Sequence, residues 1–266
     1  MSPWHQWLVI AAGMIVAMAL AWRWQRRHAN AGIVDVVWAL GMGASAVLVA
    51  ATGTGAALPR TCLAIMAGVW SLRLASHLWR RVRQEEDGRY RALRERWHGH
   101  QGKFFGLFMF QAGLVMLFCL PFLAVGVSPA QGGAAALGVA IWLAALTGEI
   151  IADRQLDRFR DDPAHRGQTC RAGLWRYSRH PNYFFEWCHW FGYVALAWGS
   201  PLAGLAWLGP VLMFVFLRWI SGIPFTEQQA LRTRGDDYRD YQRRTSAFFP
   251  WLSLIHISEP TRLLSI

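Results

Sequence analysis

Seven long runs of apolar residues constrain the fold of this chain more than any other feature of its sequence. They cover residues 4–22, 33–52, 61–79, 104–127, 133–152, 183–199 and 202–220. Each run has roughly the 17 to 25 residues that a helix needs to cross the hydrocarbon core of a bilayer. Because the backbone finds no water there, each spanning segment must be helical. The pattern predicts an all-α polytopic membrane protein with seven transmembrane helices.

The composition favours the same class of protein. Hydrophobic residue types make up 54% of the 266 residues and charged types only 16%, too few to cover a soluble protein of this length. The net charge of +11 is spread between the apolar runs instead of forming one patch, so we expect no nucleic-acid partner. The four cysteines lack the spacing of a zinc site, and no metal site is predicted.

The basic residues gather in alternate linkers and so predict an orientation. The linkers after the first, third and fifth apolar runs, together with the segment after the seventh, hold 24 of the 27 basic residues. By the positive-inside rule these segments face the cytoplasm. The N-terminus is therefore predicted outside and the C-terminus inside, with membrane lipids around the helices.

The domain prediction follows from the same runs. Residues 1–252 are predicted to form a single seven-helix domain. The last residues, 253–266, have neither span length nor a periodic face, and they resemble a translated sequencing artefact. We therefore leave them out of the functional interpretation.

Ionisable residues at the edges of the spans indicate where a ligand would bind. Such residues are costly in lipid and usually face the interior of a bundle. Glu149 and Asp153 lie four residues apart on one helical face, and Asn182 and Glu186 repeat that spacing. Two polar stripes at the cytoplasmic ends of neighbouring spans predict a pocket, in which Asn182 and Glu186 suit the amide and hydroxyl groups of a ligand.

Arginine supplies 26 of the 27 basic residues, and its planar fork suits phosphate and carboxylate groups. The candidates for phosphate binding are Arg160, Arg171, Arg179 and Arg218, and the candidates for stacking on a planar ring are Trp175 and Tyr183. Anionic lipid headgroups would satisfy the same arginines. Charge alone therefore leaves a phosphate cofactor and the membrane surface open.

The segment GLWRYSRHPNYFFEW, residues 173–187, resembles the steroid 5α-reductase superfamily, and more closely its bacterial branch. The similarity extends from about residue 148 to residue 251, with weaker matches at residues 35–38 and 70–74. The RHPNY core is shared with sterol reductases and with isoprenylcysteine carboxyl methyltransferases, which use S-adenosylmethionine. The motif therefore indicates a group of related enzymes more firmly than one reaction.

The resemblance implies a membrane enzyme that binds NADPH at the cytoplasmic ends of its later helices and reduces a carbon-carbon double bond conjugated to a ketone. The residues that match cofactor-pocket positions of the reductases are Glu149, Asp153, Arg160, Asn182, Glu186 and Arg218. We accordingly expect a hydrophobic substrate, either a 3-oxo-Δ4 steroid or a similar enone. We also expect a monomer in the bacterial inner membrane with its active site open to the cytoplasm.

The resemblance also implies a group that polarises the ketone of the substrate. Asp35 falls near a glutamate that binds this ketone in the family, together with a tyrosine on the third helix. This chain has no tyrosine between residues 61 and 79, so Trp70, Arg73 or His77 is left to supply the donor. A protonated Asp35 is a further candidate, because a preorganised donor stabilises the charge that develops on the oxygen.

Two other functions stay open at this point. One is an S-adenosylmethionine-dependent membrane methyltransferase of the isoprenylcysteine carboxyl methyltransferase type. The other is a non-enzymatic membrane protein whose charges serve lipid anchoring and helix pairing. The surplus of arginine favours NADPH, because its 2′-phosphate and pyrophosphate carry more negative charge than S-adenosylmethionine does.

Overall fold

The computed structural model describes residues 1–129 and 132–251, and within these ranges helix is the one kind of regular secondary structure. The predicted all-α class is therefore confirmed. The segment 253–266, which the sequence analysis leaves out of the functional interpretation, lies outside the described residues.

The chain divides into two compact units that exchange segments. Among the described residues, unit 1 comprises residues 1–140 and 191–209, and unit 2 comprises residues 141–190 and 210–251. Three helices continue from one unit into the other, because all three boundaries, which follow residues 140, 190 and 209, fall inside helices. The prediction of one domain over residues 1–252 stays a prediction.

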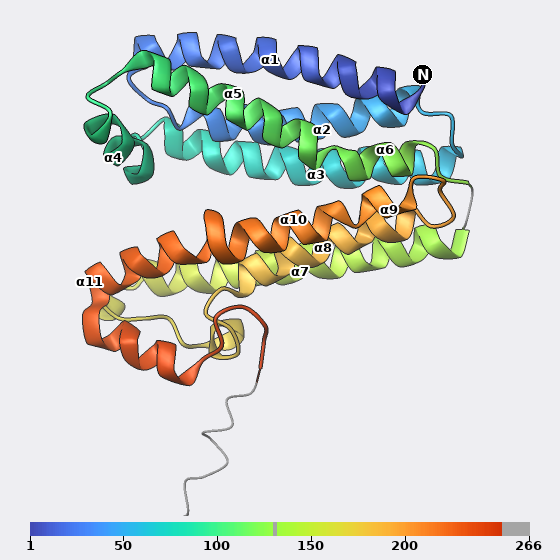
Figure 1. Ribbon diagram of the computed structural model, residues 1–266. Coiled ribbons are helices and arrows are strands. Elements are labelled where there is room, and N and C mark those ends of the chain that lie inside the picture. The colour runs from blue at the N-terminus through green and yellow to red at the C-terminus, as the bar shows by residue number, and fades with distance from the viewer. Residues whose placement is uncertain (130–131, 252–266) are drawn as a thin grey trace, which may run out of the picture. The chain divides into compact units, whose positions relative to one another are not determined.

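Unit 1 is a bundle of long helices whose axes run alongside one another (Figure 1). Its elements are α1 (Pro3–His28), α2 (Ile33–Thr52), α3 (Ala57–Val82), α4 (Gly88–Arg96), α5 (Gln101–Phe118), α6 (Leu120–Gly126) and α9 (Ala203–Ala206). Glycines allow α2 to approach its neighbours closely. A Cβ on Gly41 would overlap Met14 of α1, and a Cβ on Gly43 would overlap Ser71 of α3.

Unit 2 is built around an aromatic core. Its elements are α7 (Gly132–Asp161), the short 3₁₀ turns η1 (Pro163–His165) and η2 (Gly173–Arg176), α8 (Pro181–Leu196), α10 (Leu208–Val215), the π-helix η3 (Phe216–Ile220) and α11 (Ile223–Arg244), where α7, α8 and α10 begin or end in unit 1. Trp187 of α8 packs against Phe214 and Phe248, with ring centres 5.8 and 5.7 Å away. These contacts hold the chain after α11 against α8.

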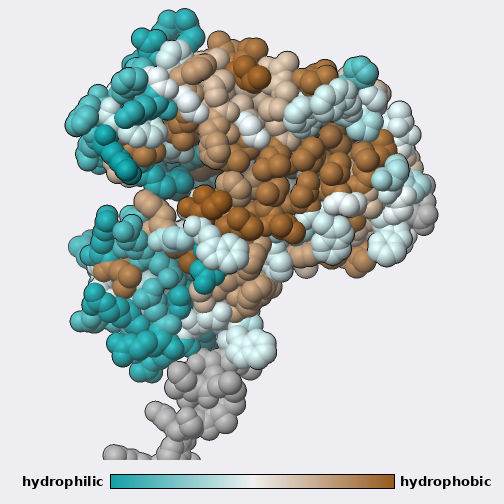
Figure 2. All heavy atoms as spheres, viewed as in Figure 1, coloured by the Kyte–Doolittle hydropathy of each residue, from teal (hydrophilic) through white to brown (hydrophobic). Residues whose placement is uncertain are grey.

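Within residues 1–129 and 132–251, six helical segments are long and apolar enough to cross a membrane. They agree with six of the seven predicted spans. The predicted span 183–199 corresponds to α8, which is helical but has only 16 residues. Outward residues of α1 such as Leu20, 61% exposed, are apolar, as a lipid-facing surface requires. Figure 2 shows hydrophobic residues along the helices and hydrophilic ones around α4 in unit 1 and α11 in unit 2.

Candidate functional site

The two polar stripes predicted from the sequence meet where α7 and α8 approach each other. A Cβ on Gly148 would overlap the ring of Phe185, so this glycine allows the close approach of the two helices. One turn further along α7, Asp153 accepts a hydrogen bond from the side-chain amide of Asn182 at 3.2 Å. Glu149 and Glu186 are both half-buried. The structure therefore brings an amide and a carboxylate of the predicted pocket into contact.

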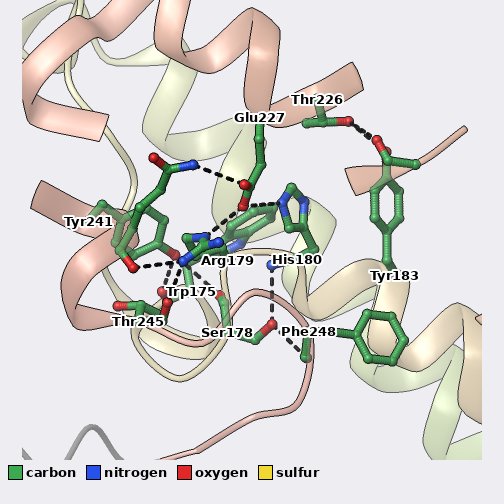
Figure 3. A network of polar contacts seen from close by, with 12 residues as sticks. Trp175, Ser178, Arg179, His180, Tyr183, Thr226, Glu227, Tyr241, Thr245 and Phe248 are labelled. Carbon is green, nitrogen blue, oxygen red and sulfur yellow. Dashed lines mark hydrogen bonds and ion pairs between the residues drawn. The ribbon is translucent and has the colours of Figure 1, made fainter. Parts of the chain in front are cut away.

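Arg179 lies in the middle of a polar network that joins α8 to α11 (Figure 3). Its Nε donates to Glu227 at 2.7 Å, and its NH1 donates to the backbone carbonyls of Gln242 and Thr245 at 2.9 and 2.7 Å. Because Glu227 is the fifth residue of α11 while Gln242 and Thr245 lie at its C-terminal end, one guanidinium connects the beginning and the end of that helix. The sequence analysis assigned the Arg179 donors to phosphate, but in the structure they bind acceptors within the protein.

His180 continues the same network (Figure 3). It is 3% exposed, its Nε2 donates to Glu227 at 3.3 Å, and its ring stacks on Tyr183 at 5.4 Å between centres. Burial lowers the pKa of His180 below its ordinary value, although the Glu227 carboxylate opposes this shift. We therefore treat the imidazole as neutral at pH 7.

The two aromatic residues predicted to stack on a ligand ring contact the protein instead. Trp175 is 7% exposed, and its indole nitrogen donates to the carbonyl of Ala152 at 2.9 Å. The Tyr183 hydroxyl lies 3.2 Å from the hydroxyl of Thr226 on α11. Both rings thus contribute to holding α7, α8 and α11 together.

The four arginines predicted to bind phosphate fall into two pairs. Arg171, like Arg179, binds acceptors within the protein: it donates to Asp237 at 2.7 Å and to Asp240 at 2.9 Å. Arg160 and Arg218 have no hydrogen bond or ion pair with any residue in the described part of the chain. These two keep their donors for other acceptors.

Arg218 occupies an unusual backbone segment. It lies in η3, the π-helix that follows α10, and π-turns often occur at functional sites. Its guanidinium carbon is 5.9 Å from the centre of the Trp219 ring, and its positive charge contributes to the lowered pKa of His180. The wide turn therefore places a cation close to the buried network of unit 2.

A second polar cluster lies in unit 1, where α2 begins. Asp35 accepts a hydrogen bond from the Tyr90 hydroxyl at 2.7 Å and an ion pair from Arg89 at 3.1 Å. A hollow of about 370 Å³ lies beside it. The hollow is lined by Gly32, Asp35, Leu78, Arg81, Val82, Gln84, Glu85, Glu86 and Asp87. The carboxylate thus meets two donors at the edge of a small cavity.

Sequence reasoning missed Tyr90, because it looked for a tyrosine only on the third span. The residue lies on α4, in a linker, and is 5% exposed. The one local signal was Asp87, which caps α4 by accepting the backbone N–H of Arg89 at 2.9 Å. Such a cap predicts a short helix, but nothing local predicts which residue that helix contacts.

The other donors proposed for the ketone lie along α3. Trp70 is 2% exposed, and its ring packs edge-on against Trp38, 6.1 Å away and one turn after Asp35. Arg73 is half-buried and His77 is exposed. Residues 1–129 and 132–251 contain no group of three or more His, Cys, Asp or Glu side chains that could hold a metal ion.

The apolar helices and the helical fold define a polytopic membrane protein. Residues 21–245 match a family described as "Protein of unknown function (DUF1295)", which is associated with steroid 5-alpha-reductase-like proteins. The chain belongs to this family. No curated protein and no solved structure matches the chain significantly.

Proposed function

We propose that the protein is a membrane-embedded, NADPH-dependent reductase that transfers a hydride to the carbon-carbon double bond of a 3-oxo-Δ4 steroid or a similar enone. The observation that carries the proposal is the family match over residues 21–245. It is supported by a set of residues in unit 2 whose chemistry fits a phosphate-bearing cofactor.

The donor set of unit 2 suits NADPH. Arg160 and Arg218 have donors that no described residue accepts, and they would hold phosphate oxygens. Asn182 and Asp153 already bond to each other, and with Glu149 and Glu186 they offer acceptors for amide and hydroxyl groups. NADPH, when bound, supplies the hydride.

Three further predicted cofactor residues enter the proposal as positioning residues. Arg171 and Arg179 use their donors on carboxylates and carbonyls of α11. Trp175 uses its indole nitrogen on α7. Their role is to fix α7, α8 and α11 so that Arg160, Arg218 and Asn182 keep their positions.

In unit 1 we propose that Tyr90, rather than a protonated Asp35, polarises the ketone. The oxygens of Asp35 accept hydrogen bonds from the Arg89 guanidinium and the Tyr90 hydroxyl, so the geometry shows Asp35 as an acceptor and Tyr90 as a donor. Since Arg89 keeps its ion pair with Asp35, the Tyr90 hydroxyl can turn its hydrogen toward a substrate carbonyl. As the double bond accepts hydride, negative charge develops on the carbonyl oxygen, and this donor stabilises it.

The proposed topology completes the description. We propose seven transmembrane helices, with α8 as the short one, the N-terminus outside and the C-terminus in the cytoplasm. The residues of unit 2 that would bind the cofactor are then on the cytoplasmic side of a bacterial inner membrane. We propose that the protein works there as a monomer.

The test compares three ligands on the detergent-purified protein. A ligand that binds only the folded state raises stability by about 2.7 kcal/mol at a concentration 100 times its Kd. We expect the unfolding temperature to rise with NADPH and much less with NADH or S-adenosylmethionine. Enones are then screened for oxidation of NADPH. A rise with S-adenosylmethionine alone would contradict the reductase proposal and favour a methyltransferase. No rise with any of the three ligands would contradict both enzyme proposals.

A further inference from the structure

A second hollow in unit 1 adjoins the one beside Asp35. Its volume is about 400 Å³, and the two hollows share four lining residues, Val82, Gln84, Glu85 and Glu86. It lies where the C-terminal ends of α1 and α3 meet the loops that follow these helices. Both helices are long and apolar enough to cross a membrane. In the proposed topology the hollow is therefore at the ends of two spans, where lipid headgroups lie.

Three aromatic residues line this hollow, Trp24 and His28 of α1 and Trp79 of α3. The imidazole of His28 stacks on the Trp24 indole, with ring centres 4.1 Å apart and planes 15° apart. The Trp79 ring lies 6.4 Å from that of Trp24 and is tilted against it by 51°. Trp79 is 40% exposed, so a ligand can reach its ring. Since tryptophan is the aromatic side chain that binds a cation best, these rings suit an ammonium group.

The same hollow is lined by residues of both charges. Arg83, the residue that follows α3, makes no hydrogen bond or ion pair through its side chain with any residue of the described ranges. Glu85 pairs with Arg91 at 3.0 Å, and the two side chains are 79% and 54% exposed. A pair this exposed contributes little to stability, so a ligand can exchange with it. The hollow thus offers a guanidinium for an anion and a carboxylate for a cation.

Glu86 holds the hollow in shape. One of its oxygens accepts hydrogen bonds from the backbone N–H of Ala31 at 2.8 Å and from Arg94 at 2.7 Å, and the other accepts the Nε of Arg94 at 3.1 Å. The side-chain amide of Asn30 donates to the carbonyl of Val82 at 2.9 Å. These bonds join the loop after α1 to the loop after α3. The hollow is therefore formed before any ligand binds, which favours affinity.

We propose that this hollow binds a zwitterionic phosphoethanolamine group. The ammonium lies against Trp24 and Trp79 within reach of Glu85, and the phosphate binds Arg83. An anionic headgroup would be repelled by Glu85, and a simple cation would be repelled by Arg83. A group that carries both charges a few ångströms apart is attracted by both residues.

Two sources carry this group. One is the headgroup of phosphatidylethanolamine, and the position of the hollow at the ends of α1 and α3 fits a lipid. The other is a soluble phosphoester such as glycerophosphoethanolamine. Both present the same chemistry to the hollow. The inference does not depend on the proposed reductase activity.

The experiment measures lipid binding to the detergent-purified full chain by native mass spectrometry. The Kd of phosphatidylethanolamine is compared with that of phosphatidylglycerol for the wild type and for the variants Trp79→Leu and Glu85→Gln. The matched control is Trp4→Leu. Trp4 is 62% exposed and stacks on Trp7 at the opposite end of α1, with ring centres 5.2 Å apart. A second arm adds glycerophosphoethanolamine as a competitor.

We expect the wild type to bind phosphatidylethanolamine more tightly than phosphatidylglycerol. Trp79→Leu should weaken binding of phosphatidylethanolamine about twofold to thirtyfold, the size of a cation–π contact, and Trp4→Leu should leave it unchanged. Glu85→Gln should weaken it by up to about fivefold. The same variant should not weaken binding of phosphatidylglycerol, because it removes a repulsive charge.

The second arm separates the two sources. If the lipid is the ligand, glycerophosphoethanolamine does not displace phosphatidylethanolamine. If the soluble phosphoester is the ligand, it displaces the lipid from the wild type and fails to do so from Trp79→Leu. Should Trp79→Leu fail to fold, Trp79→Phe and Arg83→Gln provide the same comparison.

The inference is overturned if phosphatidylglycerol binds as tightly as phosphatidylethanolamine, or if Trp79→Leu and Glu85→Gln bind both lipids as the wild type does. Tighter binding of phosphatidylglycerol would assign the hollow to anionic lipids instead. None of these outcomes affects the proposed function, because the stabilisation by NADPH is measured separately and involves unit 2.

Discussion

Half-buried arginines differ between the two units in their hydrogen-bond and ion-pair partners. In unit 1, Arg89 and Arg94 pair with Asp35 and Glu86 at 3.1 and 2.7 Å, and Arg60 donates to backbone carbonyls. In unit 2, Arg171 and Arg179 are paired in the same way, but Arg218 and Arg234 lie over aromatic rings and make no hydrogen bond or ion pair with any described residue. The difference leaves unit 2 with two half-buried guanidinium groups whose donors no described residue accepts.

The comparison also separates two roles for one residue type. A guanidinium that meets carboxylates and carbonyls of the chain fixes the fold, and removing it leaves buried acceptors without a donor. A guanidinium without such partners contributes little to folding. Its removal should therefore affect ligand binding and leave the stability of the empty protein nearly unchanged.

The largest effect is expected from Arg179→Ala. The side chains of Arg179 and Glu227 are 11% and 16% exposed, so the variant leaves a nearly buried carboxylate without its main partner. We expect a loss of about 3 to 5 kcal/mol in the free energy of unfolding, measured by denaturation in detergent. The exposed pair Arg239–Asp236 provides the control, and Arg239→Ala should cost less than about 1 kcal/mol. Equal losses in both variants would contradict the structural role of Arg179.

The next effect separates ligand binding from folding at Arg218. We expect Arg218→Gln to weaken NADPH binding about tenfold to a hundredfold, because one charge-assisted hydrogen bond to phosphate is lost. The unfolding temperature of the ligand-free variant should stay close to that of the wild type. Titration of NADPH and thermal unfolding of the same preparation check both statements. A large loss of stability would move Arg218 to the group of fold-fixing arginines.

A smaller effect is expected in unit 1 from Tyr90→Phe. The change removes the hydroxyl that donates to Asp35 and leaves the ion pair from Arg89 in place. We expect a loss of about 1 kcal/mol in the free energy of unfolding. If Tyr90 polarises the ketone, turnover of an enone falls much more than stability does. Tyr177→Phe, a change at a side chain that is 37% exposed, is the matched control and should alter neither quantity.

The smallest effect concerns the dependence of unit 1 on pH. Burial works to raise the pKa of Asp87, but hydrogen bonds and charges from Arg89, with the charge of Arg81, hold it below its ordinary value. A carboxylate with a lowered pKa stabilises the fold above about pH 4 and loses this contribution as the pH falls through its folded pKa.

The difference in unfolding temperature between wild type and Asp87→Asn should therefore be largest at neutral pH and shrink toward pH 3. Asp236→Asn, a change at a side chain that is 92% exposed, is the control. Because asparagine also caps helices, a difference that grows in acid would show that the charge of Asp87 is not what stabilises the fold.

The sequence predicted those features that depend on local pattern. Hydropathy located the helices, and the four-residue spacings from Glu149 to Asp153 and from Asn182 to Glu186 predicted two polar stripes because helical faces repeat every three to four residues. The sequence could not predict that Arg179 would form hydrogen bonds within the protein while Arg218 would form none, since this depends on where α11 packs. Tyr90 was missed for the same reason, because its contact with Asp35 joins residues 55 positions apart.

The length of α8 has a consequence for the surrounding lipid. Its 16 residues extend about 24 Å, less than the roughly 30 Å of a typical hydrocarbon core. In the proposed seven-span topology, a transmembrane helix this short creates a hydrophobic mismatch, which the bilayer relieves by thinning around it. Headgroups and water would then reach closer to Glu186. Lipids with shorter acyl chains should accordingly favour the folded protein, and the thickness of the host membrane becomes a determinant of how well this chain is accommodated.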